Sequence, residues 1–250
     1  MHSHAAPDQL NRLLAALSAV DFALLAPDLK DVRHKQGVLL QEAGDPIKVV
    51  YFPRTGMISL LAVMRAGNGV ETATVGREGA VGVMAGLGGR TAIGRAVVQV
   101  AGVSSQISAS RFLEAANASV GVRDLISRYN DTQMTFVHQS AGCNALHHVT
   151  ARLCRWLLQT RDRSDSDILS LTHEVLSQML GVQRTTVTRL ARSLQDLGLV
   201  RYRRGKIEIV DRLGLEQKAC ECYEVVRRKT EEMFSSYGPI PRAPRPKEAW

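Results

Sequence analysis

Long apolar runs are missing from this 250-residue sequence, which contains no stretch of about 18 consecutive apolar residues, the length that a membrane-spanning helix requires. Its first residues, MHSHAAPDQL, also lack the basic and then apolar order that marks a secretory signal. These two absences predict a cytoplasmic protein without a membrane partner.

Cysteine is scarce, with four residues at Cys143, Cys154, Cys220 and Cys222. In a reducing compartment these side chains are expected to be free thiols. Cys220 and Cys222 are separated by one residue, which is too close for an ordinary zinc knuckle, and no second pair lies near them in the sequence. We therefore predict no metal site and no cofactor.

Catalytic motifs are also missing. The sequence has no glycine-rich phosphate loop, no nucleophile elbow, no His-Glu-x-x-His pattern and no paired metal-ligand motif. We predict that the protein is not an enzyme.

What the sequence does have is an excess of positive charge. Its 32 basic and 24 acidic residues give a net charge of +8, which favours a polyanionic partner without identifying it. The length suits two domains of ordinary size, and a hydrophobic content of 45% indicates that they are globular.

The most informative stretch runs from Leu171 to Asp211. Gly181 allows a tight turn, and Ser177 is small where two helices must approach closely. After the turn, apolar residues recur at the spacing of a helix packed on one face: Val187, Leu190, Leu194 and Leu197. This pattern predicts a helix-turn-helix.

The second helix of this motif carries a polar and basic face suited to the DNA major groove, where guanidinium groups read guanine or grip phosphate and threonines meet base edges. We predict that its DNA contacts are Gln183, Arg184, Thr185, Thr186, Thr188, Arg189 and Arg192. Val200 and Tyr202 then alternate with charged residues up to a basic turn, which predicts a β-hairpin wing. Its contacts, to phosphates, are expected to be Arg203, Arg204 and Lys206.

Two other interpretations of this basic face stay open. It can be an ordinary solvated helix face, or the surface of a ligand- or protein-binding module whose helix-turn-helix serves as an interaction surface. Such a module is expected to lack basic residues on the second helix, so Arg184, Arg189 and Arg192 favour DNA.

Before this motif, the spacing of apolar residues changes along the chain. Two short helices are predicted between 9 and 26, with Ser18 as a cap. Between 31 and 107 the apolar period is two and glycine turns recur, which predicts an antiparallel roll or barrel. The expected strands are 38–40, 47–52, 57–63, 70–75, 95–100 and 103–107.

A long helical pattern follows from Val120 to Thr160, and its length implies a partner helix. The expected seam, shared between a dimer partner and the roll, has an approximate 3.5-residue repeat formed by Val122, Ile126, Tyr129, Phe136, Cys143 and Leu146. After the wing, 213–236 is predicted to be a helix packed on the winged domain, and the proline-rich segment 237–250 is predicted to be a flexible tail.

The segment Gly181-Val-Gln-Arg-Thr-Thr-Val-Thr-Arg189, followed by the short wing, resembles the DNA-binding domain of the Crp/Fnr superfamily of bacterial transcription regulators. The resemblance implies an α+β fold with an antiparallel β-roll sensor domain, a long dimerisation helix and a C-terminal winged helix-turn-helix domain. The resulting division is 1–30 N-terminal helices, 31–118 cyclic-nucleotide-binding-like β-roll, 119–150 dimerisation helix, 151–212 winged helix-turn-helix, 213–236 C-terminal helix and 237–250 tail. The implied partners are a second copy of the chain, double-stranded DNA with a two-fold symmetric site, and RNA polymerase.

The family's ligands are not supported by this sequence. Val83 stands where cyclic-nucleotide-binding relatives have a ribose-binding Glu, and Ala92 and Ile93 stand where they have the phosphate-binding Arg and its Ser. A shifted register would place Arg90 and Thr91 there, but it would not restore the Glu. No cysteine precedes Cys143 to hold an iron–sulfur cluster, and the histidines before residue 138 are limited to His2, His4 and His34. The effector is unknown.

Overall fold

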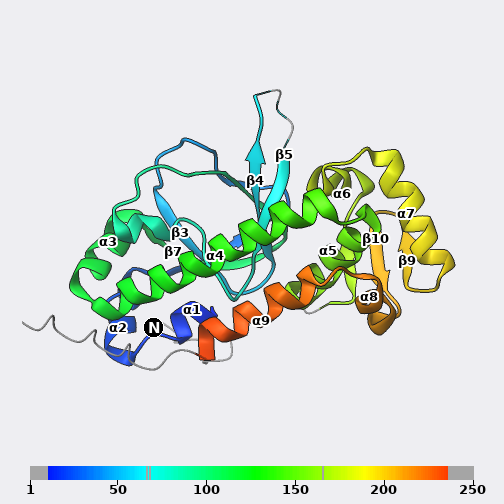
Figure 1. Cartoon of the computed structure of the whole chain (residues 1–250). Helices are drawn as coiled ribbons and strands as arrows, with labels where there is room; N and C mark the ends of the chain where they lie inside the picture. The colour runs from blue at the N-terminus through cyan, green and yellow to red at the C-terminus, as the bar shows by residue number, and fades with distance from the viewer. Residues whose placement is uncertain (1–10, 66, 68, 165, 236–250) are drawn as a thin grey trace, which may run out of the picture.

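The computed structural model describes residues 11–65, 67, 69–164 and 166–235. The predicted tail at 237–250 and the first residues lie outside this part of the chain. A two-sheet roll occupies one end of the molecule and a helical domain with a small sheet the other, and the long helix α4 connects them (Figure 1). None of the described helices has the length and apolar content needed to cross a bilayer.

The N-terminal helices close one end of the roll. They are α1 (Arg12–Ala15) and α2 (Ala19–Ala23), followed by the 3-10 turn η2 (Ala26–Asp28). Ser18 caps α2 as predicted, accepting a hydrogen bond from the Asp21 amide at 3.1 Å. Leu13 and Leu14 are buried in a cluster with Phe52 of the roll, and this apolar contact fixes the helices on its end.

Two antiparallel sheets form the roll. The first has the order β1-β7-β3, and the second has the order β2-β6-β4-β5. Their bounds are β1 (Lys30–His34), β2 (Leu39–Gln41), β3 (Val49–Pro53), β4 (Met57–Val63), β5 (Gly69–Val75), β6 (Arg95–Val100) and β7 (Gly102–Ser108). All six predicted strands are present to within two residues at each end. The unpredicted strand β1 lies at a sheet edge and has no fully buried residue, so its charged sequence gives no apolar alternation.

Three helices lead from the roll into the second domain: α3 (Ala109–Ala118), α4 (Val120–Leu146) and α5 (Val149–Ser164). The helix expected to continue to Thr160 breaks at His147, whose ψ of 142° is extended. Five of the six residues of the expected seam are buried within the chain itself, and Leu146, at 81% exposed, is the exception. These side chains therefore pack within the chain itself. A helix of a partner chain would have to pack on another face of α4.

The second domain is a winged helix. It contains α5, β8 (Ile168–Ser170), α6 (His173–Leu180), α7 (Arg184–Asp196), β9 (Val200–Arg203) and β10 (Lys206–Ile209), with the sheet order β8-β10-β9. Strand β8 was not predicted, because three residues are too few to show a period. The core around Trp156, Leu176 and Val187 continues into the roll through Met57 and Leu61, so the two domains share apolar packing.

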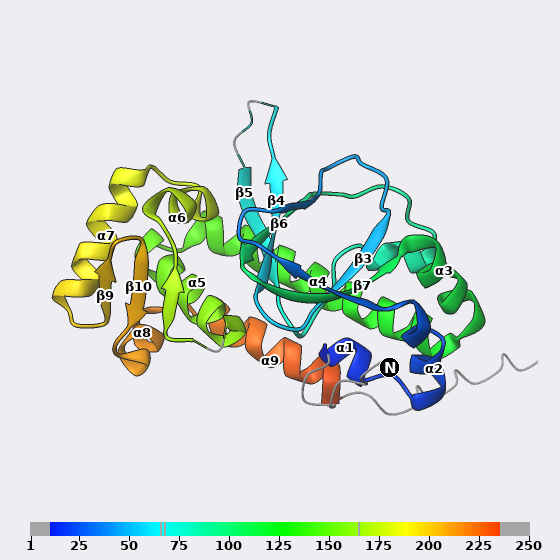
Figure 2. The same ribbon diagram turned by 180° about the vertical axis from the view of Figure 1, so that it is seen from behind.

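The C-terminal segment differs from the prediction of one helix on the winged domain. It forms α8 (Arg212–Lys218) and α9 (Cys222–Ser235), with a break at 219–221. Helix α8 packs on α5, whereas α9 runs back along α4 toward α1 (Figures 1 and 2). There Arg12 pairs with Glu231 at 2.8 Å, so the N-terminal helices contact the last described helix.

Candidate nucleic-acid interface and sensor pocket

The turn between α6 and α7 has the geometry that the sequence predicts. The Thr172 hydroxyl caps α6 by accepting from the Val175 amide at 3.2 Å. Gly181 ends the helix in the left-handed region with φ of 63°, and the Val182 amide donates to the Ser177 carbonyl at 3.0 Å. This tight ending lets α7 begin at Arg184, three residues after Gly181, at a new angle.

Helix α7 is sharply divided into a buried and an exposed face. Val187, Ala191 and Leu194 are buried against the domain core. The predicted DNA-contacting residues lie away from that core: Gln183, Arg184, Thr185, Thr188, Arg189 and Arg192 are exposed, and Thr186 is half-buried. The structure thus brings the predicted reading residues to one solvent-facing surface.

The wing presents a basic tip beside this surface. Strands β9 and β10 are antiparallel, with Val200 opposite Ile209 at one end and Arg203 opposite Lys206 at the other. Arg204 and Gly205 have φ of 46° and 75°, as a tight hairpin turn requires. The exposed cations of the interface make no ion pair with any other residue in the described part of the chain: Arg184, Arg189, Arg192, Arg203, Arg204 and Lys206. They are available to a polyanion.

A contact that the sequence did not reveal fixes the wing against both helices. The His173 ring stacks on Tyr202 with a centroid distance of 4.3 Å, and its Nδ1 lies 2.9 Å from the Thr188 hydroxyl. Burial and then the positive charge of Arg184 lower the pKa of His173. Because Thr188 also donates to the Arg184 carbonyl at 3.1 Å, its hydroxyl positions α7 as well as facing solvent.

Buried polar contacts join the roll to the winged domain. Trp156 Nε1 donates to Glu71 Oε1 at 2.8 Å, and Ser59 Oγ donates to Glu71 Oε2 at 2.5 Å. Burial raises the pKa of Glu71 to about 7. Nearby, Arg163 pairs with Glu78 at 2.7 Å, and both side chains are almost fully buried.

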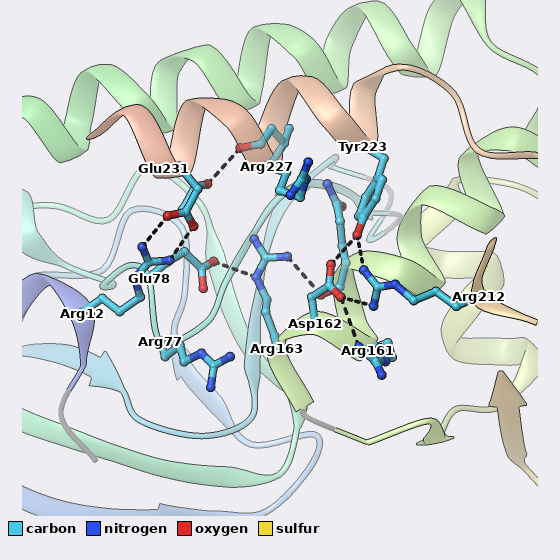
Figure 3. Close-up of a pocket in the computed structure, with 13 residues that line it drawn as sticks. Arg12, Arg77, Glu78, Arg161, Asp162, Arg163, Arg212, Tyr223, Arg227 and Glu231 are labelled. Carbon is cyan, nitrogen blue, oxygen red and sulfur yellow. Dashed lines mark hydrogen bonds and ion pairs between the residues drawn. The ribbon is translucent and has the colours of Figure 1, made fainter. Parts of the chain in front are cut away.

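An arginine-rich cavity of about 390 Å³ adjoins this contact, between α5, α9 and the end of β5 (Figure 3). Its acidic residues are each engaged by an arginine: Glu231 by Arg12, Glu78 by Arg163, and Asp162 by Arg212 at 2.7 Å. Ion pairs therefore line the cavity, and one of them, Arg163–Glu78, joins the winged domain to the roll.

A second cavity lies inside the roll and is bounded on one side by α4. Its volume is about 290 Å³, and both Val83 and Ala92, the positions expected for a nucleotide cassette, line it. Its polar lining residues are uncharged: Gln41, Thr72, Thr91, Tyr129, Asn130 and Gln133. No charged side chain is among the described residues that line this cavity, and Thr91 is present without Arg90. The wall from α4 includes Met134 and Val137.

A β-roll joined by a long helix to a winged helix with an exposed basic reading face defines a class of DNA-binding regulators. Within this class, residues 151–218 match the Crp-like helix-turn-helix domain family. Beyond this segment, the chain is similar in fold to a transcriptional regulator of the Crp/Fnr family from Eubacterium rectale, with a TM-score of 0.62 at 20% identity over 82% of this chain and 96% of that one.

One curated relative and two further solved structures are also similar to this chain. The global nitrogen regulator of Synechococcus elongatus is 26% identical over 186 residues, which cover 70% of this chain and 83% of the relative. FixK2 from Bradyrhizobium japonicum has a TM-score of 0.66 at 15% identity and covers 77% of this chain and 98% of its own. The c-di-GMP-responsive global regulator CLP of Xanthomonas campestris has a TM-score of 0.62 at 18% identity, with coverage of 77% and 99%. At these identities the two structures establish the shared fold.

Proposed function

We propose that the protein is a homodimeric, sequence-specific DNA-binding transcription regulator that acts in the cytoplasm. The observation that carries this proposal is the exposed face of α7, where Arg184, Arg189 and Arg192 point away from the core without an acidic partner in the described residues. Unpaired guanidinium groups on a major-groove helix fit base edges and phosphates.

We propose that the interface has two parts, α7 for contacts with bases and the wing for contacts with phosphates. Arg189 lies in the second turn of α7, where we propose that it contacts a guanine, and Thr185 lies one turn earlier on the same face. Arg203, Arg204 and Lys206 on the wing are proposed to contact phosphates, because a hairpin tip beside the reading helix meets the backbone.

Dimerisation through α4 is supported by a face that the expected seam did not include. Exposed residues recur along this helix at alternating spacings of four and three: Ser127, Asp131, Met134, His138, Ala141 and Ala145. This is the period of a two-helix seam, and Ser127, Ala141 and Ala145 are small enough to permit close approach of a second α4. A two-fold dimer would place two copies of α7 on half-sites about 34 Å apart.

The roll is proposed to have lost the cyclic-nucleotide cassette. A cyclic phosphate carries a full negative charge, and its burial without a cation or a sufficient set of donors costs several kcal/mol. The cavity between the roll and α4 supplies neither the Glu nor the Arg of the cassette, because Val83 and Ala92 occupy those positions. An uncharged, mainly apolar effector fits this cavity better than a nucleotide.

Selection of bound DNA from a random pool tests the proposed function. A palindromic site enriched by the full chain, with a footprint of two half-sites, is the expected result. Enrichment of no sequence, together with salt-sensitive binding to every duplex, would show a basic surface without sequence specificity. RNA polymerase is proposed as a further partner, tested by transcription from a promoter that carries the selected site.

A further inference from the structure

Three of the four cysteines meet a histidine at the junction between α4, α8 and α9. Cys143 and His147 come from the end of α4, Cys220 lies in the break after α8, and Cys222 begins α9. The four ligand atoms all lie within 4.8 Å of one another. Cys143 Sγ is 3.5 Å from Cys220 Sγ, and Cys222 Sγ is 3.4 Å from His147 Nδ1.

We propose that these four residues form a structural zinc site of the Cys₃His type. A tetrahedral zinc ion with Zn–S bonds of about 2.3 Å separates its sulfur ligands by roughly 3.8 Å, so the observed spacing needs only small adjustments. Three soft sulfur donors and one imidazole select zinc over magnesium or calcium, which prefer oxygen. A closed set of four protein ligands is typical of a structural site.

The surroundings of the cluster support this assignment independently of the ligands. His147 Nε2 lies 3.1 Å from Glu221 Oε1, so the carboxylate can hold the ring with Nδ1 directed at the cluster. A carboxylate on the far nitrogen is the usual outer partner of a zinc-bound histidine. Gln139 Nε2 also donates to Cys222 Sγ at 3.0 Å.

Positive charge near the cluster suits a set of thiolates. Zinc with three thiolates and a neutral imidazole carries a net charge of −1, and Arg152 and Arg155 of α5 are both buried and close enough to act on Cys143 electrostatically. A buried anionic centre is costly unless cations accompany it. The two arginines can therefore stabilise the filled site.

Sequence spacing alone excluded this site, because the Cys220–Cys222 pair has no second pair nearby in the chain. The fold supplies the two missing ligands from far away in the chain: Cys143 is 77 residues from Cys220, and His147 is 75 residues from Cys222. It also places them where α4 ends and α5 begins, so a bound zinc ion would tie the start of α9 to the link between the roll and the winged domain. A disulfide would use only two of these ligands.

Metal analysis of the full chain, purified under reducing conditions without chelators, tests the proposal. We expect one zinc ion per chain and, after zinc removal, uptake of one Co²⁺ with the thiolate charge-transfer and tetrahedral d–d absorption of a sulfur-rich site. Absence of stoichiometric zinc and of this cobalt spectrum in folded protein would overturn the proposal. An iron–sulfur spectrum, or a Cys143–Cys220 disulfide in freshly isolated, thiol-protected protein, would also overturn it.

Substitutions locate the metal. Cys220→Ser and His147→Asn should each abolish stoichiometric Co²⁺ binding, whereas Cys154→Ser, which removes a buried cysteine outside the cluster, should leave it intact. The exposed Glu221→Gln preserves shape and should weaken zinc 10- to 100-fold, as expected for an outer partner. Because this last variant removes no buried group, it keeps the test valid if a cysteine variant misfolds. Equal metal content in native and Cys220→Ser protein, or equal zinc affinity of native and Glu221→Gln protein in competition with a chelator, would place the ion elsewhere.

Discussion

Trp156 of the winged domain donates its indole N–H to the buried carboxyl of Glu71 in the roll, at 2.8 Å. Ser59 holds the other carboxyl oxygen, so one acidic group from β5 is bound both by its own sheet and by the neighbouring domain. The interface between the domains thus contains a titratable group within its core. Its protonation affects the free energy of unfolding.

Stability should fall as the pH rises through the range in which Glu71 ionises. Burial raises its pKa from 4.5 to about 7, although Ser59, Arg155 and Trp156 act in the opposite direction. The contribution is fully present below about pH 4.5, where folded and unfolded chains are both protonated. It is lost as the pH rises to about 7, and the free energy of unfolding decreases by roughly 3 kcal/mol over this interval.

Glu71→Gln provides the check by urea denaturation between pH 4.5 and 8. Glutamine can still accept from Trp156 and can donate to Ser59, so the variant should lack this pH-dependent loss and be more stable than the native chain above pH 7. Parallel pH profiles for both proteins would show that Glu71 is not the titrating group.

Arg189→Ala should reduce affinity for the selected site by about 1–3 kcal/mol and affect random DNA little, because a base contact is lost. Arg204→Ala on the wing should weaken binding to both DNAs alike and reduce the salt slope by about 1. Fluorescence anisotropy with the selected and the random duplex, at several salt concentrations, measures these affinities. Arg201→Ala is the matched control, since this exposed arginine is paired with Glu208 at 2.8 Å. Equal losses on cognate and random DNA would remove Arg189 from the base-reading residues.

Thr185 should alter which base pair is read. The resemblance of the segment Gly181–Arg189 to the Crp/Fnr reading helix implies a glutamate at this position in relatives, where it accepts from a cytosine amino group. A threonine can instead pack on a thymine methyl. We expect the native chain to keep the guanine read by Arg189 and to change or relax the neighbouring preference. Thr185→Glu should shift that preference toward the relatives' base. Identical selected sites for both proteins would mean that α7 docks in another register.

Introducing charge on the exposed face of α4 should separate the proposed dimer. Ala141→Glu places two carboxylates in a seam with little room for them, so light scattering at micromolar concentration should change from dimer to monomer. Leu213→Glu is the control, because Leu213 is 70% exposed and lies on α8, which packs on α5. A native monomer that binds DNA as one chain per site would refute dimerisation itself.

Cyclic AMP and cyclic GMP should not stabilise the protein. A ligand present at 100 times its dissociation constant stabilises the folded chain by about 2.7 kcal/mol, which raises the melting temperature by several degrees. Differential scanning fluorimetry with millimolar nucleotide should show no such rise. A clear rise that Thr91→Val abolishes would place the nucleotide in the roll and contradict the loss of the cassette.

The sequence predicts those elements whose apolar spacing matches the face that they bury in the structure. The period of Val187 and Leu194 placed α7 and hence the reading face, and glycine turns separated the strands of the roll. Sequence could not show contacts that depend on the assembled fold. The approach of Cys143 to Cys220, the stacking of His173 on Tyr202 and the break at His147 leave no periodic signal. The 3.5-residue repeat on α4 is visible in the sequence, but five of its six members are buried within the chain itself, Cys143 among them against Cys220 and Cys222. The sequence cannot show this, since a buried seam has the same pattern whichever partner covers it.

Helix α9 makes the two ends of the described chain meet. Its 14 residues extend for about 21 Å from the junction at His147 to the N-terminal helices, where Glu231 binds Arg12 and the Arg12 guanidinium lies over the Phe234 ring at 4.1 Å. The winged domain is therefore connected to the roll end of the molecule twice, once through α4 and once through α9. A rotation of the winged domain about the α4–α5 junction must carry the start of α9 with it, and must either bend this helix or detach its far end from α1. The orientation of α7 relative to the roll is thereby coupled to the contact between Arg12 and Glu231 at the opposite end of the molecule.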